Sequence, residues 1–261
     1  MAVRIQRALV TGASAGIGEQ FARQLAQREV ALTLVARRRD RLEELAGELD
    51  VDVEVLPADL TDPGDRELVE RRLQADERPV DLLVNNAGVG SYGQFRRLDL
   101  GEQARMVELN VTALMRLSHA AVGAQRARGR GGIINVGSTA GFQPDPNAAT
   151  YGATKAFVRS FTEALAEELR SEPVRVMLLA PGFTATEFQQ VAEIEPGLLP
   201  RAAQMTAGPV VAAALRDFAR GRTVCVPGAA NTLTALGADV VPSALSRRVS
   251  GLVHRRFGGP A

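Results

Sequence analysis

Several residue types on which common functional sites depend are scarce in this 261-residue sequence. Cys225 is the only cysteine, which excludes a disulfide within the chain and a cysteine metal cluster, and suits a reducing cytoplasm. The two histidines, His119 and His254, lie far apart in the sequence, which argues against a zinc site and against a serine–histidine hydrolase. We therefore expect a site that contains no metal.

Long apolar runs and a surplus of one charge are absent as well. No run of eighteen apolar residues occurs, so we expect no transmembrane helix, and arginines interrupt the first apolar run too early for a signal peptide. The formal net charge of +1 provides no general attraction to nucleic acid or to an anionic membrane. With 46% hydrophobic and 23% charged residues, the composition is typical of a soluble globular protein, which we expect in the cytoplasm.

Short apolar runs alternate with helical patterns along the whole chain. The predicted strands are Arg7–Val10, Ala31–Ala36, Val53–Ala58, Asp81–Asn86, Gly132–Gly137, Val174–Ala180 and Thr223–Gly228. The predicted helices are Gly16–Arg28, Asp40–Leu49, Asp65–Asp76, Glu102–Arg128, Ala153–Ser171 and Val210–Arg220. Nearly continuous apolar strands indicate a sheet covered on both faces, and the alternation indicates right-handed crossovers between parallel strands. We predict an α/β, doubly wound, Rossmann-type parallel sheet of about seven strands with helices on both faces. The domain spans 1–228, and 229–261 form a C-terminal helical extension of it.

A glycine-rich segment, "TGASAGIG", follows the first predicted strand and opens a helix. Its glycines are spaced G-x3-G-x-G, and they can provide a tight turn, a close approach of a pyrophosphate, and close packing of helix on strand. The helix N-terminus offers free N–H groups and a positive dipole to the anion. A purely structural glycine turn is the alternative, but the position directly after the first strand favours a dinucleotide. The candidate contacts are Gly12, Ser14, Ala15, Gly16, Ile17 and Gly18.

The end of the second predicted strand bears on the choice between NAD and NADP. Enzymes that use NAD place an acidic residue about twenty residues beyond the glycine loop, on the ribose 2′-hydroxyl. Here Ala36 stands at that point, and arginines follow it. Arginine suits a 2′-phosphate because it makes charge-assisted, often bidentate hydrogen bonds. We therefore predict NADP(H), with Arg37 as the first candidate and Arg38 as the second; Arg39 and Arg41 fit a solvated helix start better.

Lys155 is the only lysine among 31 basic residues, and it follows Tyr151, one of two tyrosines, by four positions. A surface lysine on an amphipathic helix is the simple alternative. Residues at i and i+4 share a helix face, however, and lysine presents a compact ammonium with three donors. A nearby ammonium, together with the positive nicotinamide ring of the oxidised cofactor, favours tyrosinate, so we expect the pKa of Tyr151 to be lowered toward the operating pH. The pair predicts a site of proton transfer.

Taken in order, these motifs resemble the single-domain branch of the short-chain dehydrogenase/reductase family, over roughly Ala8 to Thr186. Further motifs that carry the resemblance are "NNAG" (Asn85–Gly88), "ELNVTA" (Glu108–Ala113), "INVGS" (Ile134–Ser138), "YGATK" (Tyr151–Lys155) and "PGFTAT" (Pro181–Thr186). The resemblance implies an NADP(H)-dependent oxidoreductase that transfers a hydride between the nicotinamide and a carbonyl or secondary alcohol. A 3-oxoacyl reductase, a hydroxysteroid-type dehydrogenase and a non-catalytic NADP-binding regulator remain alternatives.

The resemblance also assigns roles to individual residues. Tyr151 is the general acid, Lys155 binds the nicotinamide ribose, Ser138 donates to the substrate oxygen, and Asn110 completes a proton relay through water to Lys155. Further cofactor contacts are Asp59 and Leu60 on the adenine side, Asn86, Ala87 and Gly88 beside the adenosine ribose, and Pro181, Gly182, Thr184 and Thr186 near the nicotinamide; Tyr151 and Lys155 also contact the cofactor. Local structural roles are the alternatives: a turn cap at Ser138, a helix bend at Asn110, a helix cap at Asp59, and plain loop threonines at Thr184 and Thr186. The side chain of Asn85 is expected to tie strands together.

The substrate and the partners are less well determined by the sequence. Pro181–Pro209 has the character of a lid with apolar side chains, and Tyr92, Phe95 and Phe142 are expected on the same side, which favours a bulky apolar carbonyl. The lid residues are Phe183, Phe188, Ile194, Leu198 and Leu199. The tail, Ala230–Phe257, packs on the body, extends the pocket or rests on a membrane surface, in that order of preference. The two longest predicted helices resemble the family's four-helix seam, so we expect a homodimer or homotetramer.

Overall fold

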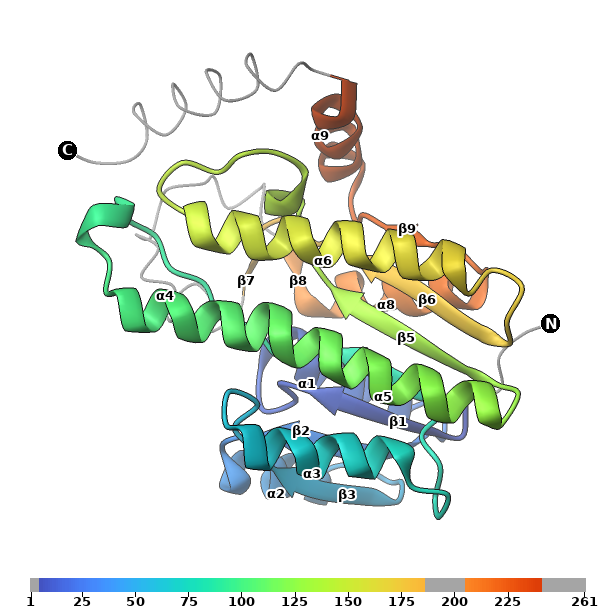
Figure 1. Ribbon diagram of the computed structural model, residues 1–261. Helices are drawn as coiled ribbons and strands as arrows, with labels where there is room; N and C mark the ends of the chain where they lie inside the picture. The colour runs from blue at the N-terminus through green and yellow to red at the C-terminus, as the bar shows by residue number, and fades with distance from the viewer. Residues whose placement is uncertain (1–4, 186–204, 241–261) are drawn as a thin grey trace.

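A seven-stranded parallel sheet forms the centre of the molecule, in the order β3-β2-β1-β4-β5-β6-β9 (Figure 1). The computed structural model describes residues 5–185 and 205–240. Thr186, four of the five expected lid residues and all of the tail after residue 240 lie outside these ranges. The sheet confirms the predicted fold class. From β1, the strands β2 and β3 are added toward one edge of the sheet, and from β4, the strands β5, β6 and β9 are added toward the other edge.

The strands lie within one or two residues of the predicted runs, except for the last one, which is shorter. They are β1 (Arg7–Thr11), β2 (Ala31–Ala36), β3 (Val53–Pro57), β4 (Leu82–Asn85), β5 (Gly131–Val136), β6 (Val174–Leu179) and β9 (Val224–Cys225). A separate pair of two-residue strands, β7 (Thr184–Ala185) and β8 (Met205–Thr206), joins the two described flanks of residues 186–204.

Helices cover both faces of the sheet because successive strand residues point to opposite sides. On β1, Ala8 and Val10 belong to one core and Leu9 to the other. The first core lies under α1 (Gly16–Ala26), α2 (Arg39–Gly47) and α8 (Ala207–Ala219). The second lies under α3 (Pro63–Gln74), α5 (Leu114–Ala127) and the end of α6 (Ala149–Glu168), which stand in front of the strands in Figure 1.

Two helices differ from the prediction in ways that matter for the site. The predicted helix Glu102–Arg128 consists of α4 (Leu100–Val107), a π-helical segment η2 (Glu108–Ala113) and α5. A π segment adds a residue to one turn, which hydrophobic periodicity does not show. The helix predicted from Ala153 begins at Ala149, so Tyr151 and Lys155 both lie within α6.

The first part of the tail forms a helix, α9 (Ala229–Val240), that packs on the short 3-10 helix η3 (Thr139–Phe142). This contact favours the body and the pocket over a membrane surface for the described part of the tail. In the two described ranges, no helix has both the length and the apolar character needed to cross a bilayer. The division of the chain at residue 228 remains a prediction.

Candidate active site

Six segments that carry predicted site residues begin at the same edge of the sheet. Because all strands are parallel, their carboxyl ends lie together, and open α/β sheets bind ligands there, where the strand order reverses. The reversal lies between β1 and β4. Each strand is followed by its candidate: β1 by Gly12, β2 by Arg37, β3 by Asp59, β4 by Asn86, β5 by Ser138 and β6 by Pro181.

The glycine loop has the form that a cradle for a phosphate requires. Gly12 and Gly16 have φ values of 64° and 60°, which side chains rarely adopt. A Cβ atom on Gly18 would lie 2.2 Å from the carbonyl oxygen of Gly12, so only glycine allows this approach. Ala15 precedes α1 without a side-chain cap, which leaves the first N–H groups of the helix for an anion. A dinucleotide pyrophosphate fits this arrangement.

Thr11 and Asn86 fasten the glycine loop to the loop after β4. The Asn86 side-chain amide donates to the carbonyl oxygens of Thr11 at 2.9 Å and Gly12 at 3.2 Å. In return, the Thr11 hydroxyl accepts from the N–H groups of Asn86 at 2.9 Å and Ala87 at 3.0 Å. Sequence reasoning did not assign a role to Thr11, although its place at the end of β1 was a usable signal. Asn85 donates to Asn135 on β5 at 2.9 Å, which ties two strands together as expected.

Arg37 and Arg38 are both exposed at the end of β2. The Arg38 guanidinium donates to the Ser14 hydroxyl at 3.1 Å and so lies on the glycine loop. The positive charge of Arg37 lies near enough to Asp59 to help lower the pKa of its carboxyl group. Arg39 pairs with Glu43 one helical turn away, as its assignment to the helix surface implies. Two cations therefore lie beside the end of β2, one at the glycine loop and one near Asp59.

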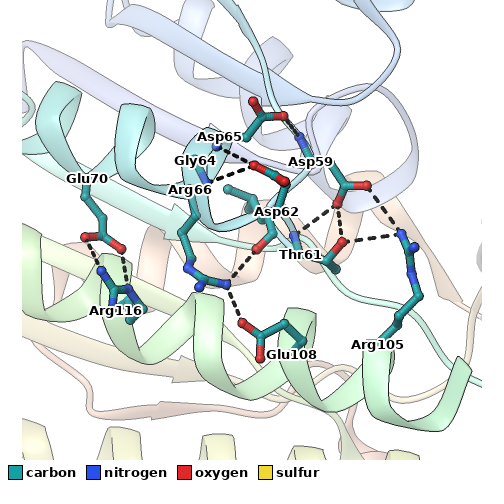
Figure 2. Close-up of polar contacts among 11 residues, drawn as sticks. Asp59, Thr61, Asp62, Gly64, Asp65, Arg66, Glu70, Arg105, Glu108 and Arg116 are labelled. Atoms are coloured by element: carbon teal, nitrogen blue, oxygen red, sulfur yellow. Dashed lines mark hydrogen bonds and ion pairs between the residues drawn. The ribbon is translucent and has the colours of Figure 1, made fainter. Parts of the chain in front are cut away.

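Asp59 is held in place by the loop that leads into α3 (Figure 2). Its carboxylate accepts from the backbone N–H of Thr61 at 3.0 Å and from the Thr61 hydroxyl at 2.7 Å. Burial raises the pKa of Asp59, but the Thr61 hydrogen bonds and the charges of Arg37 and Arg105 together bring that pKa below its ordinary value. The helix-cap alternative for Asp59 is wrong, because Asp62 accepts from the N–H groups of Gly64 and Asp65 at the start of α3.

Ser138, Tyr151 and Lys155 converge between η3 and α6. Ser138 hydrogen-bonds to the Tyr151 side chain, and its hydroxyl also accepts from the N–H of Ala140 at 3.1 Å, so the turn-cap role is present as well. The Lys155 ammonium lies 5.8 Å from the centre of the Tyr151 ring and donates to the Val136 carbonyl at 2.9 Å. Lys155 is only 6% exposed, which excludes the simple surface-lysine alternative.

Burial controls the protonation of this pair in the protein alone. It raises the pKa of Tyr151 to about 12, against the opposing effect of the Ser138 hydrogen bond. It lowers the pKa of Lys155 to about 8. The part of the expectation that rests on Lys155 alone is therefore not met, because the loss of water around the phenol outweighs the Ser138 hydrogen bond.

Asn110 lies inside the π-helical segment η2 and is 1% exposed. Its side chain donates to the Val89 carbonyl at 2.9 Å and to the Thr154 hydroxyl at 3.1 Å, and it accepts from the Val89 N–H at 3.0 Å. A Cβ atom on Gly88 would lie 3.1 Å from the Asn110 oxygen and 3.5 Å from the Lys155 ammonium. Because Gly88 has no side chain, Asn110 and Lys155 can both lie close to it. The π-helical segment around Asn110 also agrees with the alternative that Asn110 bends its helix.

The loop after β6 lies against the start of helix α9. The Thr184 hydroxyl donates to the Gly182 carbonyl at 3.1 Å, and a Cβ atom on Gly182 would lie 2.5 Å from the side-chain oxygen of Asn231 on α9. Asn231 was not among the predicted site residues, since nothing in the sequence connects the tail with Gly182. Phe95 and Phe183 remain 58% and 43% exposed, so apolar surface is available on loops at this end of the molecule.

Comparison with known proteins was made on this basis. A family model described as "short chain dehydrogenase" matches residues 6–196. Sulfoacetaldehyde reductase 2 from Chromohalobacter salexigens is 40% identical over 187 residues, which cover 70% of this chain and 74% of that protein. A short-chain dehydrogenase from Sphingobium yanoikuyae in complex with NADPH is 38% identical, with a TM-score of 0.83 and 98% of both chains covered. A bulky-bulky ketone specific alcohol dehydrogenase from Comamonas testosteroni is 33% identical, with a TM-score of 0.76, and covers 98% of this chain and 97% of its own.

Proposed function

Because the chain belongs to the short-chain dehydrogenase family, we propose that it interconverts a carbonyl and a secondary alcohol with NADP(H). One observation carries the proposal: Ser138, Tyr151 and Lys155 lie together at the carboxyl edge of the sheet, beside a glycine loop that fits a pyrophosphate. When bound there, NADPH supplies the hydride, and the protein must supply orientation and a proton.

The cofactor-binding residues follow the edge of the sheet from β3 to β6. Gly12–Gly18 would hold the pyrophosphate, and Arg37 and Arg38 would hold the 2′-phosphate. Asp59 and Leu60 would contact the adenine, and Asn86, Ala87 and Gly88 would contact the ribose. Lys155 would bind the nicotinamide ribose, and Pro181, Gly182 and Thr184 would contact the nicotinamide side; Thr186, which the sequence also assigns there, lies outside the described residues.

Tyr151 is the general acid in the reducing direction. A pKa of about 12 keeps the phenol protonated at neutral pH, so its proton is present when a carbonyl oxygen gains negative charge. Ser138 holds that oxygen by donating its single hydroxyl hydrogen to it in place of Tyr151, and the present hydrogen bond supports this role because it shows that the two side chains lie together. Asn110 completes the proton path to Lys155, which its position beside Gly88 supports.

A bulky apolar ketone is the substrate class that we favour. Exposed phenylalanines on loops at this end of the molecule support it, as does the likeness to an enzyme described as specific for bulky-bulky ketones. The relative described as a sulfoacetaldehyde reductase points instead to a small polar aldehyde. Aryl ketones, oxosteroids, 3-oxoacyl thioesters and small polar aldehydes therefore belong in one substrate panel.

The panel is read by NADPH absorbance, with NADH run in parallel. We expect turnover of at least one bulky apolar ketone and a clear preference for NADPH. A clear preference for small polar aldehydes would reject the substrate class, and equal rates with NADH would reject the role of Arg37 and Arg38.

Tyr151→Phe separates an enzyme from a non-catalytic NADP-binding regulator. Removal of the phenol hydroxyl deletes the proton donor, so we expect turnover to fall by at least about 100-fold. NADPH affinity, measured by calorimetry, should stay within about threefold, because one contact of many is lost. Turnover that survives this substitution would show that Tyr151 is not the acid.

We also propose that the chain acts as a homodimer or homotetramer in the cytoplasm. Exposed apolar side chains on α4, α5 and α6 support self-association, since these helices resemble the family's four-helix seam. Val107, Met115 and Phe157 are 42%, 42% and 36% exposed in the single chain. The cytoplasmic location rests on the single cysteine alone.

A further inference from the structure

A buried arginine connects the adenine side of the cleft with the helix that carries Asn110. The Arg66 side chain, on α3, is 7% exposed. One nitrogen of its guanidinium donates both to the Leu60 carbonyl at 3.2 Å and to the Glu108 carboxylate (Figure 2). Leu60 belongs to the loop that holds Asp59, and Glu108 is the first residue of the π-helical segment η2. A single cation therefore touches both segments.

The π-helical segment is anchored on opposite sides by two of its own side chains. Asn110 bonds to Val89 and to Thr154 on α6, while Glu108 bonds to Arg66 on α3. A π turn is rare and is less regular than an α turn, so its side-chain contacts decide where it forms. Removal of the Glu108 anchor would let η2 shift and would move Asn110 relative to Val89.

Two other ion pairs lie nearby, one between α4 and the loop before α3 and one between α5 and α3, but both involve exposed arginines. Arg105, on α4, lies 3.4 Å from Asp59, and Arg116, on α5, lies 2.6 Å from Glu70. These two arginine side chains are 62% and 47% exposed, against 7% for Arg66. Glu108 itself is 37% exposed, so the difference lies in the arginine: one as buried as Arg66 is left as an uncompensated charge when it loses its carboxylate, whereas an exposed arginine is solvated by water. The pair of Arg66 and Glu108 is therefore the one that constrains geometry.

We propose that Glu108 and Arg66 are positioning residues that couple the adenine-side loop to Asn110. The inference rests on the proposed function, because Asn110 matters only if it serves the proton path. Binding of the cofactor against Leu60 then orders Arg66, which also holds η2 through Glu108. Cofactor affinity and turnover therefore both depend on the contact between Arg66 and Glu108. We assign neither residue a direct contact with the cofactor or the substrate.

Glu108→Gln tests the coupling with little change of shape, and Glu70→Gln is its matched control. Each substitution removes the negative charge from an arginine–glutamate pair that links α3 to a later helical segment. The Glu108 pair links α3 to η2, whereas the carboxylate of Glu70 bonds to Arg116 on α5. For E108Q we expect kcat to fall by about tenfold or more and the NADPH Kd to rise by about threefold, since displacements of about 1 Å can cost on the order of 100-fold in rate. E70Q should leave both within about twofold.

Hydrogen exchange supplies a readout that needs no substrate. The Val89 N–H donates to the Asn110 side chain, so E108Q should speed exchange in the peptide that contains Val89, and E70Q should not. If E108Q matches E70Q in kcat, Kd and exchange, the coupling is overturned. If the wild-type chain binds NADPH but reduces no carbonyl, the proposed function fails, while the Kd and exchange measurements still decide the coupling.

A double variant separates positioning from stability. Arg66→Met with Glu108→Leu replaces the ion pair by apolar side chains, which commonly preserves or raises stability. We expect its Tm to lie near that of the wild type while kcat stays low and Val89 exchange stays fast. Recovery of kcat together with Tm would show that the pair acts only through stability and would overturn the proposal.

Discussion

Lys155 illustrates how one side chain acquires a function from its surroundings. It is buried, it donates to the Val136 carbonyl, and burial lowers its pKa to about 8. The ordinary lysine pKa of 10.5 would leave the ammonium unchanged throughout the physiological range. The spacing from Tyr151 could be recognised in the sequence, but the direction of both pKa shifts could not, because it depends on how much water reaches the two groups.

The shifted pKa of Lys155 predicts a pH dependence of cofactor binding. Below pH 8 the ammonium is present and can donate a charge-assisted hydrogen bond to the ribose, and it is lost as the pH rises through about 8. We expect the NADPH Kd, measured by calorimetry between about pH 7 and pH 9.5, to rise by about tenfold, since hydrogen bonds to charged groups contribute roughly 1.5–3 kcal/mol. Lys155→Met should show weak binding that does not vary with pH. A flat profile for the wild type would contradict the assignment.

At the scale of elements, the site depends on how closely η3 approaches α6. A Cβ atom on Gly141 in η3 would lie 2.5 Å from the Lys155 carbonyl oxygen, which is backbone and cannot move independently. This approach brings Ser138, at the start of η3, to Tyr151. The sequence contained the glycine but not the approach, because the separation of η3 and α6 depends on how the two elements pack in the folded chain.

Gly141→Ala should therefore separate η3 from α6. We expect a loss of stability of about 1–3 kcal/mol from overpacking. Because Ser138 moves away from Tyr151, kcat should fall at least about tenfold while NADPH affinity changes little. Activity and affinity are measured well below the Tm of the variant, so that unfolding does not contribute.

Gly123→Ala is the control for this substitution. Gly123 lies exposed within α5, and nothing lies within 4 Å of a Cβ atom built there. Alanine should raise stability by about 0.5–1 kcal/mol, because it favours the helix, and it should leave kcat unchanged. A Gly141→Ala variant with unchanged kcat would show that the close approach has no role in the site.

At the scale of the whole molecule, the order of the sheet decides which loops meet. The six candidate segments come from strands spread over most of the chain, and they share one edge because every pairing in the sheet is parallel. Outside this edge, the helices α4, α5 and α6 expose apolar side chains that the single chain does not cover.

Met115→Glu tests whether this exposed surface is buried between copies of the chain. Light scattering of the wild type should give a multiple of 27.8 kDa. Because a buried carboxylate is costly, Met115→Glu should shift the mass toward the monomer. Leu68→Glu, on α3, changes a residue of similar exposure, 45% against 42%, and should leave the mass unchanged. A monomeric wild type would reject the proposed assembly.

The sequence by itself determined the alternation of strands and helices, the glycine spacing and the pairing of Tyr151 with Lys155. These depend on periodicity and on spacings of a few residues, which local chemistry controls. Tertiary structure alone decided the contact of Arg66 with Glu108, 42 residues apart, the π-helical segment, and the burial that shifts both pKa values in the Tyr–Lys pair. Such properties depend on which elements lie side by side and how much water they exclude, and neither is a property of a short stretch of chain.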